Sequence, residues 1–173
     1  RVHCVKDTVI RTRAQTVPLR IYYPSKKCMS EERPIIFYIH GGAFVYGSVE
    51  QYDMLAKKIS RATRSIVTSV DYRLAPDHPY PCAIEDSYCA LEWVASHAED
   101  LGGSRDGVCV MGTSAGGNIA TVLTLKSRDM GHPHIACQIL YYPSTTFRDI
   151  EFPSRTHFLR DTSRSYFLTE KLL

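Results

Sequence analysis

Continuous apolar runs alternate with amphipathic helical patterns along most of this sequence, and no other feature constrains the fold as strongly. Residues 35–39 form such a run, residues 66–70 nearly do, and residues 108–111 and 139–142 are similar. Runs without polar alternation are typical of parallel strands that helices cover on both faces. We therefore expect a mostly parallel sheet at the core of the chain.

Helical periodicity fills the segments between these runs. The clearest pattern places five apolar residues on one face of a helix: Ile84, Tyr88, Leu91, Ala95 and Ala98. An earlier helix is expected to bury Leu55, Ile59 and Ala62, after a capping-box pattern over residues 48–51. A third helix is expected to begin near residue 114. The intervening segments are therefore predicted to cross over between the parallel strands.

The first part of the chain has a different pattern. Residues 5–13 and 17–23 alternate apolar and polar side chains, which is typical of strands with one covered face. Two strands followed by alternating strands and helices predict an α/β fold in which an antiparallel edge joins a mostly parallel sheet. The 173 residues, 44% hydrophobic and 23% charged, fit a soluble globular protein with a real core.

Charge and hydropathy exclude several classes of partner. Basic residues number 21 and acidic residues 18, and they are interspersed, so we expect no nucleic-acid partner. No apolar stretch reaches the roughly 20 residues that span a bilayer, which predicts no transmembrane segment. No signal peptide is visible, and a cytoplasmic location is expected. The six cysteines form no CxxC pair and no zinc-like grouping with histidine, so neither metal nor cofactor is expected.

The strongest chemical signal is Gly-x-Ser-x-Gly, formed by Gly112, Ser114 and Gly116. It stands where an apolar strand ends and a helix begins, the context that a nucleophile elbow requires. Such a turn strains the serine backbone, and glycines on either side avoid Cβ clashes. The spacing fits neither a dinucleotide fingerprint nor a P-loop. Ser114 is therefore our candidate nucleophile.

A second motif follows the apolar run that ends at residue 39. The N–H groups of Gly41 and Gly42, together with that of Ala115 after the serine, are candidates for an oxyanion hole. Acyl transfer passes through a tetrahedral intermediate whose negative oxygen needs preorganised donors. His40 precedes these glycines and is expected to make structural hydrogen bonds that hold the loop, rather than to act as the base.

Three ordered segments resemble the hormone-sensitive-lipase family of α/β-hydrolases, which includes carboxylesterases and arylacetamide deacetylases. They are His-Gly-Gly-Ala-Phe over residues 40–44, Asp-Tyr-Arg-Leu-Ala-Pro over 71–76, and Gly-Thr-Ser-Ala-Gly-Gly-Asn over 112–118. The resemblance implies an α/β-hydrolase fold and a Ser, Asp or Glu, His triad in chain order. It gives no catalytic role to Asp71 or Arg73, which we expect to form a structural ion pair.

The resemblance also implies a longer chain. No acid and histidine after Ser114 occupy strand ends like those of the family; Asp149 and His157 have the right order, but the segment between them is polar and irregular. We assign no triad acid or base within these residues, and expect the C-terminal strands and most of the cap to be missing. Residues 1–146 are predicted to form the N-terminal part of the hydrolase core and 147–173 the start of a cap insertion.

The combined interpretation is a serine carboxylic-ester hydrolase acting on small acyl esters through an acyl-enzyme at Ser114, although this fragment alone is expected to be nearly inactive. Phe44, Tyr46 and Tyr142 are candidates for pocket lining, with core or rim packing as the alternative for each. Two other hypotheses remain: a non-catalytic small-molecule receptor on the same fold, and a truncated product that never folds stably. Oligomeric state is left open.

Overall fold

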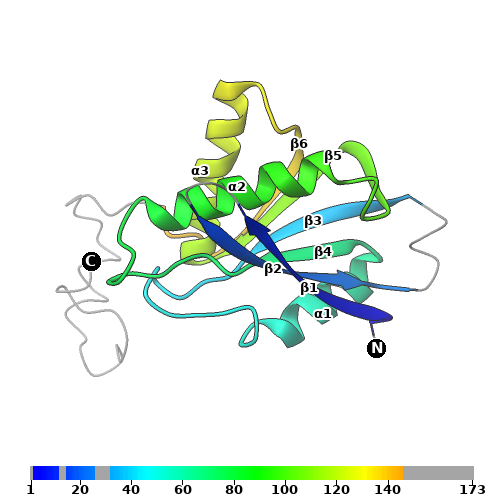
Figure 1. Cartoon of the computed structure of the whole chain (residues 1–173), viewed down its shortest axis with the longest axis horizontal. Helices are drawn as coiled ribbons and strands as arrows, with labels where there is room; N and C mark the ends of the chain where they lie inside the picture. The colour runs from blue at the N-terminus through cyan, green and yellow to red at the C-terminus, as the bar shows by residue number, and fades with distance from the viewer. Residues whose placement is uncertain (1, 12–14, 26–31, 146–173) are drawn as a thin grey trace. The chain divides into compact units, whose positions relative to one another are not determined.

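A computed structural model describes residues 2–11, 15–25 and 32–145 (Figure 1). The elements along the chain are β1 (Cys4–Arg11), β2 (Thr16–Tyr23), β3 (Arg33–Ile39), α1 (Asp53–Thr63), β4 (Ile66–Val70), α2 (Cys82–Ser96), β5 (Gly103–Thr113), α3 (Ala115–Met130) and β6 (Ile135–Tyr141). Each apolar run predicted to be a strand is one. No helix among the described residues is long and apolar enough to cross a membrane.

The strands form one sheet in the order β1-β2-β4-β3-β5-β6. β1 pairs antiparallel with β2, and β2 pairs antiparallel with β4. The remaining pairs, β4 with β3, β3 with β5, and β5 with β6, are parallel. The predicted α/β fold with an antiparallel edge and a mostly parallel sheet is therefore confirmed.

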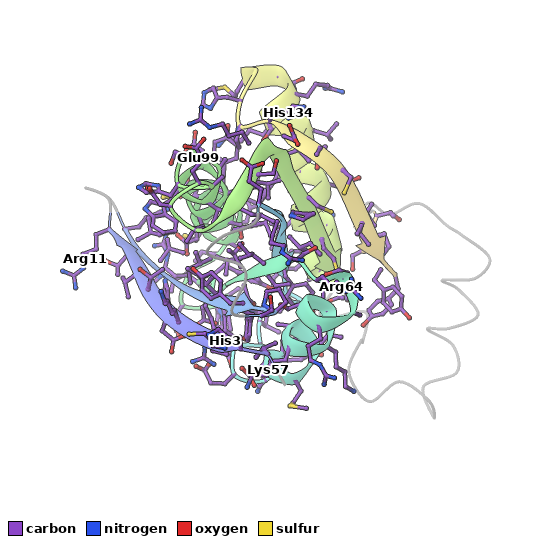
Figure 2. All side chains as sticks on the ribbon, turned by 90° about the vertical axis from the view of Figure 1, so that its right-hand side faces the viewer. His3, Arg11, Lys57, Arg64, Glu99 and His134 are labelled. Carbon is purple, nitrogen blue, oxygen red and sulfur yellow. The ribbon has the colours of Figure 1, made fainter. Side chains whose placement is uncertain are left out.

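Helices cover both faces of the central strands β3 and β4, as their continuous apolar runs predict, whereas β6, predicted in the same way, is mostly exposed. Ile35, Phe37 and Ile39 of β3 belong to the larger core beneath α2 and α3, whereas Ile36 and Tyr38 belong to a smaller core beneath α1. Figure 1 shows α2 and α3 on one side of the sheet and α1 on the other. Figure 2 shows the same separation after a 90° turn, with α1 on the opposite side of the sheet from α2 and α3.

The buried face of α1 differs from the predicted one. Leu55 is 38% exposed and Ala62 is also exposed, whereas Ile59 packs against the smaller core as predicted, and Ala56 and Ser60 are fully buried. The large Tyr22 and Tyr38 side chains already fill the sheet surface on this side, so the helix packs through small residues. The helix also begins after the capping-box pattern, although Ser48 Oγ still accepts a hydrogen bond from the Gln51 N–H at 3.3 Å.

The predicted ion pair between Asp71 and Arg73 is wrong. Arg73 instead donates from Nε and Nη2 to the carboxylate of Asp86 on α2, each at 2.8 Å, and its backbone N–H donates to the same carboxylate at 3.0 Å. The Asp86 side chain is fully buried and the Arg73 side chain is 30% exposed. This ion pair joins the segment after β4 to the first turns of α2. Asp71 accepts a hydrogen bond from the Val49 N–H at 3.1 Å.

The elements above all lie in one compact unit, residues 1–143, and a second unit comprises residues 144–173. The predicted cap insertion over 147–173 lies outside the described residues. Its assignment therefore stays a prediction.

We expect Asp86→Ala to lower the free energy of unfolding by about 3–5 kcal/mol, because it leaves the Arg73 guanidinium without its buried partner. Urea denaturation of the full-length protein measures this change. The matched control is Asp129→Ala, which removes an exposed partner of Arg128 and should change stability by no more than about 0.5 kcal/mol. Equal losses for the two variants would contradict a structural role for the Arg73–Asp86 pair.

Candidate active site

Ser114 stands at the junction between β5 and α3 with φ 52° and ψ −118°. A positive φ is costly for a residue with a Cβ, so surrounding contacts must hold this conformation. The Ser114 N–H donates to the Tyr141 carbonyl at 3.0 Å, and the Ser114 carbonyl accepts from the N–H of Gly117 at 2.9 Å. The nucleophile candidate is therefore anchored to β6 on one side and to the first turn of α3 on the other.

The glycines around Ser114 permit backbone segments to approach closely. A Cβ on Gly112 would lie 2.1 Å from the Gly116 carbonyl oxygen. A Cβ on Gly116 would lie 2.2 Å from the carbonyl oxygen of Ile39 and 2.4 Å from that of His40. The turn at Ser114 thus packs directly on the end of β3, where the second sequence motif begins.

The loop after β3 lies beside the nucleophile candidate. A Cβ on Gly41 would stand 3.2 Å from the Ser114 Cβ, so these two residues are in close contact. Gly42 has φ 129°, and its carbonyl accepts the N–H groups of Val45 and Tyr46 at 2.9 and 3.0 Å. Ala43 continues the unusual backbone with φ 50°. The structure therefore brings the two sequence motifs together at the carboxyl ends of the neighbouring parallel strands β3 and β5.

Four backbone N–H groups near these strand ends donate no hydrogen bond to any residue that the structure describes: those of Gly41, Gly42, Ala43 and Ala115. Three of them are the predicted oxyanion donors. Ala43 was not predicted, because alanine gives no sequence signal for a left-handed backbone. Ala115 is the first residue of α3, where the helix dipole also favours negative charge.

His40 is enclosed beneath this loop, and neither of its ring nitrogens forms a hydrogen bond with Ser114. Its Nδ1–H donates to the Gly41 carbonyl at 2.7 Å, and its Nε2 is buried without a partner among the described residues. The ring stacks on Tyr72 at 4.3 Å and on Tyr52 at 5.4 Å between centroids. Tyr72 also donates its hydroxyl to the His40 carbonyl at 3.0 Å. These contacts fit the predicted structural role.

Burial lowers the pKa of His40, an effect that the Gly41 carbonyl and the nearby Asp71 carboxylate oppose. The imidazole is consequently neutral at physiological pH, with the proton on Nδ1 directed at the loop. The pKa of Asp71 is raised, because its partial burial outweighs the hydrogen bond from Val49. His40 is thus positioned to support the loop as a neutral ring, and Asp71 supports the neighbouring segment through its hydrogen bond from Val49.

The three predicted pocket residues differ in their surroundings. Phe44 packs against the main core, which is the alternative considered for it. Tyr46 and Tyr142 are 50% and 65% exposed, and both are close enough to Tyr52 to raise the pKa of its hydroxyl, after the larger effect of burial. Tyr52 was missed, since nothing in the sequence before α1 distinguishes it from a surface residue. Within the described ranges, no cluster of His, Cys, Asp or Glu could hold a metal ion.

Comparison with known proteins identifies the family of the chain. Residues 36–173 match the protein family described as alpha/beta hydrolase fold. The chain belongs to the α/β-hydrolase family of the hormone-sensitive-lipase type. Relatives of this α/β-hydrolase include Esterase LipI of Mycobacterium tuberculosis, 44% identical over 87% of this chain and 47% of the relative. Human arylacetamide deacetylase-like 2 is 35% identical over 85% of this chain and 38% of its own length.

Solved structures give the same assignment. An esterase from Pyrobaculum calidifontis superposes on this α/β-hydrolase with a TM-score of 0.90 and 37% identity, covering 99% of this chain and 54% of that protein. A thermophilic carboxylesterase, EstE1, cloned from a metagenomic library, gives a TM-score of 0.91 and 35% identity, covering 99% and 57%. The chain spans about half the length of the curated relatives that it matches.

We expect Gly116→Ala to slow the reaction of Ser114 with a fluorophosphonate by about 100-fold, because the added Cβ would displace the nucleophile turn from the end of β3. Mass spectrometry of the labelled protein over time measures the rate. Gly131→Ala is the matched control: a Cβ there meets no atom within 4 Å, and the strain at its φ of 75° lowers stability without touching the Ser114 turn, so the labelling rate of the folded protein should stay at the wild-type value. A wild-type labelling rate in Gly116→Ala would show that close packing there does not set the position of Ser114.

The lowered pKa of His40 gives a second expectation, about stability and pH. Between the folded pKa and the ordinary value of 6.5, the unfolded chain binds a proton that the folded chain does not. Protonation of His40 therefore does not affect the free energy of unfolding above pH 6.5. As the pH falls from 6.5 toward the folded pKa, the unfolded chain gains the proton first and the free energy of unfolding decreases. His40→Asn removes the titrating group but retains a donor for the Gly41 carbonyl, so its stability should depend less on pH below 6.5.

Urea titrations of both proteins at several pH values measure this difference. Asp71, Tyr52 and Tyr72 face His40 and are present in both proteins, so the comparison isolates the imidazole. Parallel pH profiles for His40→Asn and wild type would contradict a neutral, buried His40.

Proposed function

We propose that this chain carries the nucleophile and the oxyanion-binding loop of a serine carboxylic-ester hydrolase that acts on small acyl esters. The observation that supports this most directly is the contact between Ser114 and Gly41, beside backbone N–H groups that have no other partner among the described residues. The names of the relatives, including esterases, carboxylesterases and arylacetamide deacetylases, support the same reaction class. We also propose a small-molecule ester as the substrate.

In the proposed reaction, Ser114 Oγ forms a bond to the acyl carbon while an electron pair of the carbonyl moves onto its oxygen. The N–H groups of Gly41, Gly42 and Ala115 stabilise that oxygen, and Ala43 offers a further donor at the same loop. The serine proton passes to a base and then to the departing alcohol, leaving an acyl-enzyme that water hydrolyses. No histidine donates to or accepts from Ser114 within residues 2–11, 15–25 and 32–145. We propose that the base and its acid lie elsewhere in the protein.

Specific labelling tests the proposal. Full-length protein should form one covalent fluorophosphonate adduct at Ser114 and hydrolyse short-chain p-nitrophenyl esters, and Ser114→Ala should lose both reactions. Ser96→Ala, which changes an exposed serine at the end of α2, is the matched control and should retain both. A folded wild-type protein that binds small molecules but forms no adduct would contradict the hydrolase and favour the receptor.

A further inference from the structure

Tyr52 is held rigidly next to the candidate active site without a role in the mechanism above. Its ring stacks on His40 at an interplanar angle of 22° and lies 6.3 Å from the Tyr38 ring. Its backbone N–H donates to the Ser48 carbonyl at 3.2 Å, and its carbonyl accepts from the Ala56 N–H at 3.0 Å. Main chain and ring are both constrained, so the position of the hydroxyl is defined before any substrate binds.

That hydroxyl lies close to the nucleophile. Its oxygen lies 3.3 Å from the position that a Cβ would take on Gly41, and the Ser114 Cβ lies 3.2 Å from the same point. The Tyr52 oxygen and the Ser114 Cβ are therefore no farther apart than the sum of these distances, 6.5 Å. An oxygen on an acyl carbon bonded to Ser114 stands three covalent bonds, roughly 3 Å, from that Cβ. When that oxygen lies on the Tyr52 side of Ser114, the gap that remains is comparable to the length of a hydrogen bond.

The hydroxyl also has unused hydrogen-bonding capacity. It makes no hydrogen bond with another residue in the described part of the chain, although the Tyr52 side chain is half-buried. The hydroxyl oxygen is not among the fully buried unpaired atoms of the described residues, so it is accessible and can donate to a ligand oxygen that replaces water there. Burial raises the pKa of Tyr52, so the phenol keeps its proton across the neutral and mildly alkaline range and remains a donor.

We propose that the Tyr52 hydroxyl donates a hydrogen bond to the oxygen of the tetrahedral intermediate at Ser114, beside the backbone N–H groups of the oxyanion loop. This inference rests on the proposed hydrolase function of Ser114. Tyrosine side chains can serve as oxyanion donors, and a donor that is already in place needs no reorganisation during the reaction. The ligand is the oxyanion that forms from a small acyl ester.

Tyr52→Phe in the full-length protein tests the inference, since it removes one oxygen and leaves the ring stacked on His40. We expect kcat/KM for a short-chain ester to fall at least about 10-fold, chiefly through kcat, with KM nearly unchanged. Affinity for a trifluoromethyl ketone, which forms a tetrahedral adduct with serine, should fall by a similar factor. If Tyr52 acted only through the packing of its ring, removing the hydroxyl would change neither kcat nor the affinity for the ketone.

The matched control is Tyr80→Phe, which removes the same oxygen from a residue that is 84% exposed, and it should retain wild-type kinetics. Thermal unfolding of each variant shows whether the fold is intact. Wild-type kinetics and ketone affinity in a folded Tyr52→Phe protein would overturn the inference while leaving the hydrolase in place. A wild-type protein that forms no fluorophosphonate adduct would overturn both.

Discussion

The close packing of the Ser114 turn against the end of β3 is the contact on which the rest of the site depends. Gly116 lies against the carbonyl oxygens of Ile39 and His40 at distances that leave no room for a side chain. The strained backbone of Ser114 is held at this contact, and Gly41 is brought beside the nucleophile by the same approach. A single steric requirement thus determines both the direction of the serine and its separation from the N–H donors.

A layer of aromatic side chains supports this arrangement from beneath. His40 lies between Tyr72 and Tyr52, and its Nδ1–H holds the Gly41 carbonyl on the far side of the loop from the unpaired N–H groups. Neutral imidazole suits this position, because a charge there would be desolvated. The loop therefore owes its shape to polar and aromatic contacts rather than to regular secondary structure.

The positions of the parallel strands and of the nucleophile turn could be predicted from the sequence. The side chains that pack against each other across elements could not, because they depend on the three-dimensional neighbours of each residue. The apolar runs predicted each parallel strand, and Gly112, Ser114 and Gly116 predicted the strand-to-helix turn. The face of α1 was predicted correctly at Ile59 and wrongly at Leu55 and Ala62, because Tyr22 and Tyr38 on the sheet select small partners and the helix pattern alone does not contain that information. Arg73 likewise pairs with Asp86 because the first turns of α2 lie beside it in the fold, which the sequence spacing does not reveal. The proximity of the Tyr52 hydroxyl to Gly41 depends on the folded loop and has no counterpart in the sequence pattern.

The strand order has a consequence for how the site assembles. β3 and β5 are neighbours in the sheet, yet α1, β4 and α2 separate them along the chain, so the loop after β3 meets Ser114 only across a long closure. Non-local pairings of this kind form late and slowly compared with helices. A partly folded chain can contain the Ser114 turn and the glycine loop as separate, local structures, but without the central strand pair they do not meet. Reactivity at Ser114 would therefore report on native strand pairing and not merely on helix content.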